Sequence, residues 1–150
     1  MYVNLCKHAN MVYNGNMNTA RRIVLIFIIA FALNAFWEFW HAQFYIHYQG
    51  GAITALILLR AAMVDATIIS AITLCMMLTS RLQRGVWFMI AAGLVIAAFL
   101  ELWALSTNRW AYNETMPLIP FLHIGLTPTV QLALLGTISW FVARALYSRK

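Results

Sequence analysis

Four long apolar segments take up most of this chain of 150 residues. They lie at about 23–47, 53–79, 86–106 and 127–147, and each reaches the roughly 20 residues that a helix needs to cross the hydrocarbon core of a bilayer. Inside that core a spanning segment has to satisfy its own backbone hydrogen bonds, which a helix does. The sequence therefore predicts an all-α integral membrane protein, with residues 1–150 forming a single domain of four transmembrane helices.

Composition and charge support the same class of protein. Hydrophobic residues make up 63% of the chain and charged residues only 9%, and the mean hydropathy is +0.77. The net charge of +6 could indicate nucleic acid as a partner, but the basic residues flank the apolar segments, so topology explains them better. Most of them fall on one side of a four-span topology. We expect both termini, including a polar and irregular tail of residues 1–20, to be cytoplasmic in a prokaryotic inner or plasma membrane.

A short pattern, Phe-x-Glu-x-Trp, occurs in both the first and the third apolar segment, around Glu38 and Glu101. The two copies are 63 residues apart, and the same offset relates the basic residues Arg21 and Arg84 that precede each segment. A carboxylic acid within a bilayer is costly and rarely persists without a partner or a role. The repetition favours two parallel two-helix repeats that share a polar site.

The first segment carries a polar stripe. Asn34, Glu38, His41, Tyr45 and Tyr48 are spaced three or four residues apart, so in a helix they would lie on one face. The opposite faces carry Ile, Leu, Phe and Trp, which suit lipid. We expect the stripe to point into the bundle.

Other polar residues are predicted to lie at a similar depth. With a rise of about 1.5 Å per residue, Glu38, Arg60 and Glu101 all fall in the outer half of the bilayer, with Asp65 slightly below them. The structural alternative is an ion pair between Arg60 and one of the two glutamates. A single arginine does not neutralise three acids, so an unpaired acid would be partly protonated. The sequence predicts a polar cavity lined by Asn34, Glu38, His41, Arg60, Asp65, Glu101, His123 and Gln131.

The connection over 107–126 is broken by two prolines and a glycine, and we expect it to lie over the end of the bundle. Trp110 and Tyr112 within it are typical of an interfacial aromatic belt. Thr127 and Pro128 have the residue types of an N-cap and a first helical position, which predicts the start of the fourth helix.

Acid–base chemistry on a lipid or isoprenoid is the first functional hypothesis. A carboxylic acid would protonate an alkene or epoxide, a second group would take a proton back, and aromatic rings would attract the cation. The candidate catalytic residues are Glu38, Glu101, His41 and Asp65. The candidate substrate-binding residues are Asn34, Arg60, Trp37, Trp103, Trp110, Tyr112, His123 and Gln131.

Two local resemblances bear on this hypothesis. The run Asn34-Ala35-Phe36-Trp37-Glu38, followed by Ala42 and Tyr45, resembles the helix of small integral-membrane terpene cyclases in which a Glu after Trp is thought to be catalytic. That resemblance implies that Glu38 is the proton donor of a lyase or isomerase. A second stretch, from Glu101 through Trp110-Ala111-Tyr112 to Pro117, Pro120 and Pro128, is similar to the acid, Tyr-x-Tyr and proline layout of membrane carotenoid hydratases. Each resemblance covers a small part of the chain, and both families are longer, with more spans.

Three other functions stay open. Parallel repeats with intramembrane acids occur in proton- or ion-coupled transporters, for which four helices would have to act as a dimer. Glu38-x-x-His41 matches one element of carboxylate-bridged di-iron bundles, but the second copy has Ala104 in place of the histidine. We therefore predict no cofactor, with a single metal ion at Glu38 and His41 as the alternative. A non-catalytic assembly subunit of a larger membrane complex is the third.

Overall fold

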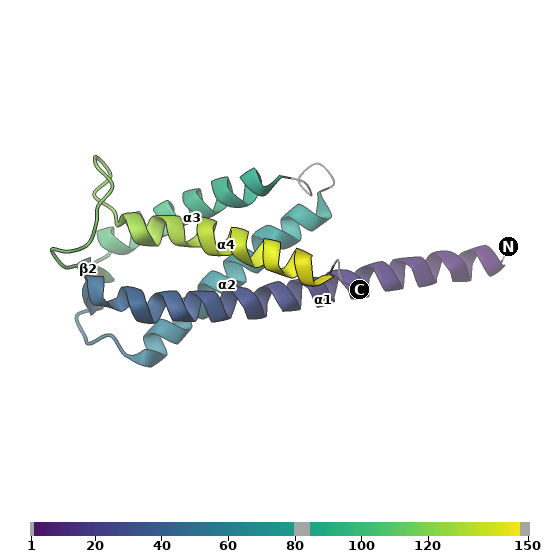
Figure 1. Cartoon of the computed structure of the whole chain (residues 1–150), viewed down its shortest axis with the longest axis horizontal. Helices are drawn as coiled ribbons and strands as arrows, with labels where there is room; N and C mark the ends of the chain where they lie inside the picture. The colour runs from purple at the N-terminus through teal and green to yellow at the C-terminus, as the bar shows by residue number, and fades with distance from the viewer. Residues whose placement is uncertain (1, 80–84, 148–150) are drawn as a thin grey trace.

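The computed structural model describes residues 2–79 and 85–147, with side chains described from Thr19 onward. The elements in chain order are α1 (Tyr2–His41), η1 (Ala42–Phe44), β1 (Tyr45–Tyr48), α2 (Ala55–Leu78), α3 (Val86–Ser106), β2 (Trp110–Tyr112) and α4 (Leu126–Tyr147) (Figure 1). Four stretches within them, Thr19–Phe44 and the whole of α2, α3 and α4, are long and apolar enough to cross a membrane. The predicted all-α, four-helix membrane fold is confirmed.

The N-terminal tail differs from the prediction. Residues 1–20 were expected to be polar and irregular, whereas α1 begins at Tyr2 and runs without a break into the first span. Extending a helix from a formed span costs much less than nucleating a new one, so the tail continues the helix. The predicted basic loop that contains Arg84 lies outside the described residues.

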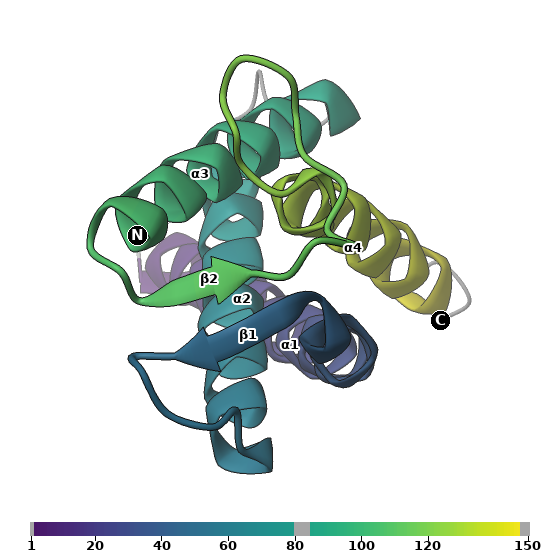
Figure 2. The ribbon, with the colours of Figure 1, turned by 90° about the vertical axis from the view of Figure 1, so that its left-hand side faces the viewer.

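The helices form two pairs. α1 packs along α2 and α3 packs along α4, while α2 and α3 contact each other over a shorter stretch (Figures 1 and 2). Ile72 and Met76 on α2 form a buried cluster with Met89 on α3. This contact is near the end of α2 and the start of α3, so the two helices meet at one end of the bundle and separate toward the other.

A small sheet at one end of the bundle was not predicted. α1 ends at His41 instead of near residue 47, and Tyr45 and Tyr48 lie on β1, so they are not part of a helical stripe. β1 pairs antiparallel with β2, with Tyr45 opposite Tyr112 and Tyr48 opposite Trp110 (Figure 2). We call this end of the molecule the strand end and the opposite end, which carries Arg22 and Arg144, the basic end.

The pairing of the strands follows the sequence repeat. Each Phe-x-Glu-x-Trp motif lies near the end of a helix, α1 or α3, and a strand follows each of these helices. Two equivalent strands that pair antiparallel are what a two-fold relation between two halves produces. The two helix-strand units therefore bring Glu38 and Glu101 to the same end of the bundle.

α3 and α4 approach each other closely at Gly93. A Cβ atom placed there would lie 2.7 Å from the Cα of Ala133. Gly93 and Ala97 are both buried on α3, and small residues four apart on a helix allow a close approach of this kind. Ala62 and Ala66, which form the small-residue stripe of α2, are fully buried.

The proline-broken segment forms a projecting loop. Met116 and Ile124 are buried and anchor its two ends, whereas Phe121 at its tip is 97% exposed. α4 begins at Leu126, one residue earlier than predicted, so Thr127 is not the N-cap; its hydroxyl instead contacts His41, 2.6 Å from Nε2. The segment therefore does not close over the bundle as expected.

Candidate functional site

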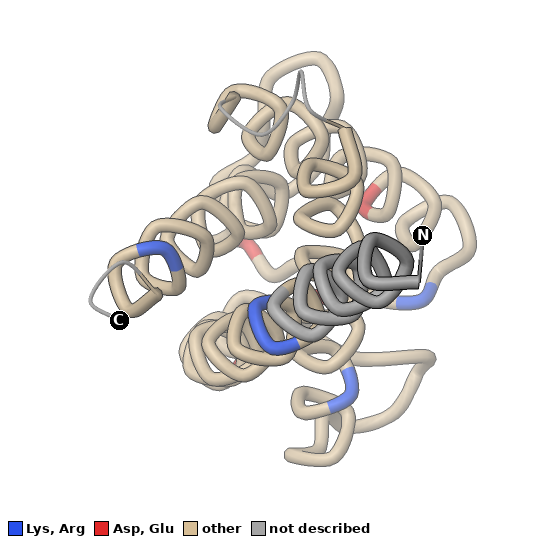
Figure 3. Tube along the Cα trace, turned by 90° about the vertical axis from the view of Figure 1, so that its right-hand side faces the viewer, with Lys and Arg blue, Asp and Glu red and all other residues tan. Residues whose placement is uncertain are grey.

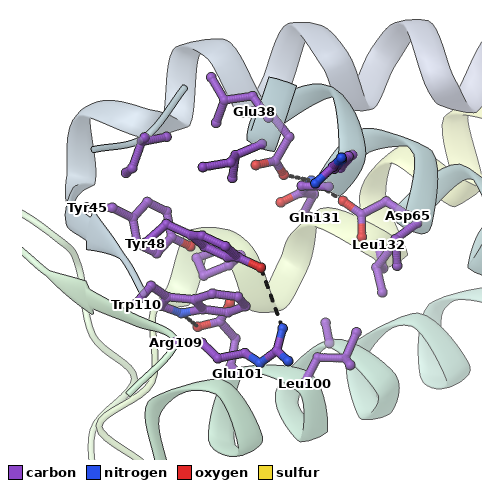
Figure 4. A pocket seen from close by; sticks show the side chains of 18 of the residues that line it. Glu38, Tyr45, Tyr48, Asp65, Leu100, Glu101, Arg109, Trp110, Gln131 and Leu132 are labelled. Carbon is purple, nitrogen blue, oxygen red and sulfur yellow. Dashed lines mark hydrogen bonds between the residues drawn. The ribbon is translucent and has the colours of Figure 1, made fainter. Parts of the chain in front are cut away.

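A cavity of about 280 Å³ lies at the strand end, between the diverging parts of α2 and α3 (Figure 4). All four helices and both strands contribute to its wall. Val64 on α2 and Trp103 on α3 line it and are about half exposed on the outer surface of the bundle. Both residues belong to helices that are long and apolar enough to cross a membrane, so part of the wall lies on the outer surface of those helices.

The wall combines apolar and ionisable side chains. The polar, charged and aromatic lining residues are Glu38, Tyr45, His47, Tyr48, Arg60, Asp65, Glu101, Trp103, Arg109, Trp110 and Gln131. The apolar ones are Ile53, Ile57, Leu58, Ala61, Val64, Ala97, Leu100, Pro128 and Leu132. An apolar pocket with a few convergent polar groups is the usual form of a small-molecule site.

Gln131 on α4 joins two of the acids. Its Nε2 lies 2.7 Å from Oε1 of Glu38, 2.9 Å from Oδ2 of Asp65 and 3.0 Å from Oδ1 of Asn34. One amide nitrogen carries two hydrogens, so it does not satisfy three oxygens at once. A proton held by Glu38 or Asp65 would supply the missing donor. The geometry thus brings together three residues that the sequence placed on three different helices.

Asn34 is held from both sides. Its own amide donates to the carbonyl oxygen of Ala30 at 2.8 Å, and its Oδ1 accepts from Gln131. Because Asn34 is fully buried and does not line the cavity, it supports Gln131 and does not contact a ligand there. Its predicted role in substrate binding is therefore replaced by a supporting one.

Glu101 has different partners. It is 5% exposed, and its Oε2 accepts hydrogen bonds from the hydroxyl of Tyr112 and from the indole N–H of Trp110 at 3.4 Å. The oxygen of Tyr112 in turn accepts from the backbone N–H of Gly125 at 2.9 Å, which fixes the ring. Two donors are therefore directed at one carboxyl oxygen of Glu101.

Aromatic residues of the two strands form the roof of the cavity. Tyr45 and Tyr48 come from β1 and pack against Trp110 of β2, with ring centroids 6.1 and 6.5 Å apart. Burial raises the pKa of Tyr45 well above its ordinary value, and the nearby carboxyl groups of Glu101 and Glu38 raise it further. The phenol therefore keeps its proton and remains a hydrogen-bond donor.

Arg109 is a lining residue that sequence reasoning missed. Its guanidinium lies 4.4 Å from the centroid of Trp103, and Nη1 donates to the hydroxyl of Tyr48 at 3.5 Å (Figure 4). The sequence feature that could have indicated Arg109 is its position directly before Trp110. Only the antiparallel pairing of β1 and β2 places this arginine near Tyr48.

Arg60 lines the cavity at its predicted depth, but as an exposed residue at the rim. Within residues 2–79 and 85–147, no salt bridge connects it to Glu38 or Glu101. The predicted ion pair is therefore not formed, because the carboxyl groups turn toward Gln131, Tyr112 and Trp110 in the interior.

Four other predicted residues are not among those that line this cavity, and one of them is Tyr112, whose hydroxyl reaches Glu101 from behind the wall. His123 is exposed on the projecting loop, with a φ of 53°. Trp37 packs against Trp40 and His41, and its indole N–H is buried without a hydrogen-bond partner. His41 is 1% exposed and lies behind Tyr45, with ring centroids 5.2 Å apart.

The positions of the possible metal ligands bear on the alternative of a single metal ion at Glu38 and His41. In the part of the chain with described side chains, no three His, Cys, Asp or Glu residues are grouped so that they could hold a metal ion. His41 is hydrogen-bonded to Thr127 and is absent from the cavity wall. Glu38 and Asp65 share one donor, the amide of Gln131, whereas Glu101 accepts from two donors.

No protein-family model, curated protein or solved structure matches this chain.

Proposed function

We propose that this protein is a membrane-embedded enzyme that carries out acid–base chemistry on an isoprenoid or other lipid substrate. Cyclisation, isomerisation and hydration belong to this class of reaction. The observation that carries the proposal is the meeting of Glu38, Asp65 and Glu101, from three helices, in one cavity with a largely apolar wall. The largely apolar wall suits a hydrocarbon substrate that enters sideways between α2 and α3.

The hydrogen bonds support different roles for the acids. Glu38 and Asp65 compete for the amide of Gln131, which favours a proton held between them, so Glu38 is the proposed proton donor. Glu101 accepts from Tyr112 and Trp110, which favours the carboxylate, so Glu101 is the proposed base. Pairs of acids whose surroundings differ in this way often divide the roles of acid and base.

The proposed reaction balances without another reactant. Glu38 gives a proton to a carbon–carbon double bond or an epoxide oxygen, and the resulting cation lies beside the ring faces of Tyr45 and Trp110. Glu101 then removes a proton from a neighbouring carbon, so one proton enters and one leaves. In a hydration, water adds to the cation before the proton is lost.

We further propose that the basic end faces the cytoplasm of a prokaryotic inner or plasma membrane. Arg21, Arg22 and Arg144 lie at that end, and basic residues accumulate on the cytoplasmic side of membrane proteins. The cavity would then open in the outer half of the bilayer. A reporter fused after Lys150 that is active only in the cytoplasm would report this orientation.

Isotope transfer tests the chemistry without a known substrate. Membranes that contain the protein are incubated in D₂O, and their lipids are compared by mass spectrometry. We expect one lipid species to gain carbon-bound deuterium, and Glu38→Gln and Glu101→Gln each to slow this labelling by about 100-fold or more.

The matched control is Glu114→Gln, which removes the remaining acid of the chain at an exposed position away from the cavity. It should leave the labelling unchanged. Equal labelling in the wild type and both cavity variants would contradict catalysis by these acids. A lipid that is retained by the wild type but never labelled would show binding without reaction.

A further inference from the structure

A second, open cavity of about 780 Å³ lies at the basic end. It is lined by Thr19, Arg22, Ile26, Thr73, Met76, Met77, Trp140, Ala143, Arg144 and Tyr147. The buried apolar residues Ala66, Ile69 and Leu135 belong to the core cluster between the helices. Since this cavity and the acidic one share no lining residue, they are separate sites.

Two guanidinium groups from different helices border this second cavity. Arg22 on α1 lies 4.7 Å from the ring centroid of Tyr147, and Arg144 on α4 lies 5.3 Å from that of Trp140. A guanidinium that stacks on an aromatic ring keeps the N–H groups at its edge free to bind an anion. The aromatic contacts therefore hold two sets of donors at the cavity.

Among the residues whose side chains the structure describes, no Asp or Glu lies beside these arginines. The chain has four Asp and Glu residues; Glu38, Asp65 and Glu101 line the acidic cavity, and Glu114 follows β2 at the strand end. Figure 3, viewed from the basic end, shows basic segments on the helix at each terminus. Arg22 and Arg144 therefore have no Asp or Glu partner within the described side chains and can bind an external anion.

We infer that the cavity at the basic end binds the phosphate headgroup of an anionic membrane lipid. Phosphate accepts paired hydrogen bonds from arginine, and basic pockets between transmembrane helices recognise such headgroups. Ile26, Met76 and Ala143 supply apolar wall for the start of an acyl chain, which free phosphate does not need. This site is independent of the proposed chemistry at the strand end.

Native mass spectrometry of the full chain tests the inference. The protein is placed in nanodiscs with equal phosphatidylglycerol and phosphatidylcholine, released, and examined for retained lipid. We expect the wild type to retain phosphatidylglycerol selectively. Arg22→Gln and Arg144→Gln, tested separately, should each weaken retention about fivefold.

Arg21→Gln is the matched control, because it removes the same charge from the neighbouring position on α1 without altering the cavity wall. It should leave retention near that of the wild type. An equal loss in Arg21→Gln would show diffuse attraction to the bilayer surface and overturn the site. Displacement of the lipid by millimolar inorganic phosphate would show a phosphate site that does not require lipid, and would also overturn the inference. If Arg22→Gln does not fold, Arg144→Gln tests the same site from α4.

Discussion

The two copies of Phe-x-Glu-x-Trp occupy equivalent places in the fold but have different neighbours. In the first half, Glu38 shares the amide of Gln131 with Asp65. In the second half, Glu101 accepts from Tyr112 and Trp110 of the strand that follows it. Gln131 lies on α4, in the second half, and donates to Glu38 and Asp65 in the first half. Its hydrogen bonds therefore connect the two halves.

The difference shows how a repeat can provide both an acid and a base. If the proposed roles are correct, the same residue type at the same level of a helix would hold a proton beside another acid and accept one beside two donors. The backbone repeats, whereas the chemistry is set by side chains that lie outside the repeated motif.

The largest effect is expected at the two glutamates. If Glu38 is the acid and Glu101 the base, the activity should have a bell-shaped pH profile. In Glu38→Gln the rate should no longer fall at high pH, because the acid that has to be protonated is absent. Glu101→Gln should abolish the rise at low pH. Each should lower the rate by about 10²–10⁴-fold, measured as deuterium transfer at several pH values. If both variants lost the same side of the pH profile, Glu38 and Glu101 would not have separate roles as acid and base.

Gln131→Leu should disrupt the first half and spare the second. The change leaves oxygens of Asn34, Glu38 and Asp65 without their shared donor, at about 1–3 kcal/mol for each buried group left unsatisfied. Thermal unfolding in detergent should show a lower midpoint. Gln131→Glu keeps the size but removes the donor, so recovery of stability by this variant would show that volume alone matters.

Gly93→Ala tests the close contact of α3 and α4 in the second half. The residue at the same place in the first half is Ala30, which is fully buried. A Cβ at position 93 would lie 2.7 Å from backbone atoms of Ala133, so we expect a loss of about 1–3 kcal/mol. Gly51→Ala is the control, because its Cβ would meet only the carbonyl oxygen of Tyr48, at 3.6 Å. A lower unfolding midpoint in both variants would rule out a local clash.

Tyr112→Phe removes a donor from Glu101 and should change the stability at alkaline pH. Burial and the neighbouring Glu101 raise the pKa of Tyr112 above the ordinary value of 10.0. The unfolded chain then loses this proton first, so the stability is full below pH 10.0 and falls as the pH rises above it. Unfolding midpoints across this range should fall less steeply in Tyr112→Phe than in the wild type. An equally steep fall in the variant would assign the effect to other groups, with Tyr45 the next to test.

The smallest effect is expected at the rim. Arg60 is exposed and makes no salt bridge within the described residues, so Arg60→Gln should change the free energy of unfolding by no more than about 0.5 kcal/mol. Arg109→Gln should cost more, because Arg109 stacks on Trp103 and donates to Tyr48. Unfolding midpoints of the two variants, measured side by side, check this order. A large loss in Arg60→Gln would revive the predicted ion pair.

Much of the candidate site followed from depth alone. Counting residues along each segment placed Glu38, Arg60 and Glu101 at one level, and all three line the cavity. His123 was expected at the cavity only if its proline-broken segment folded inward, and that segment instead forms a projecting loop. Helical periodicity also gave a wrong position for Tyr45 and Tyr48, because the helix ends at His41 and these two residues lie on a strand.

By itself the sequence determined the four spans, the all-α class and the repeated acidic motif, since apolar length and backbone hydrogen bonding leave few alternatives in a bilayer. Only the tertiary structure decided that α1 ends at His41, that β1 pairs with β2, and that Gln131 and Tyr112 are the partners of the acids. These contacts join residues far apart in the chain. Their geometry depends on how the helix pairs cross, which no local pattern of residues encodes.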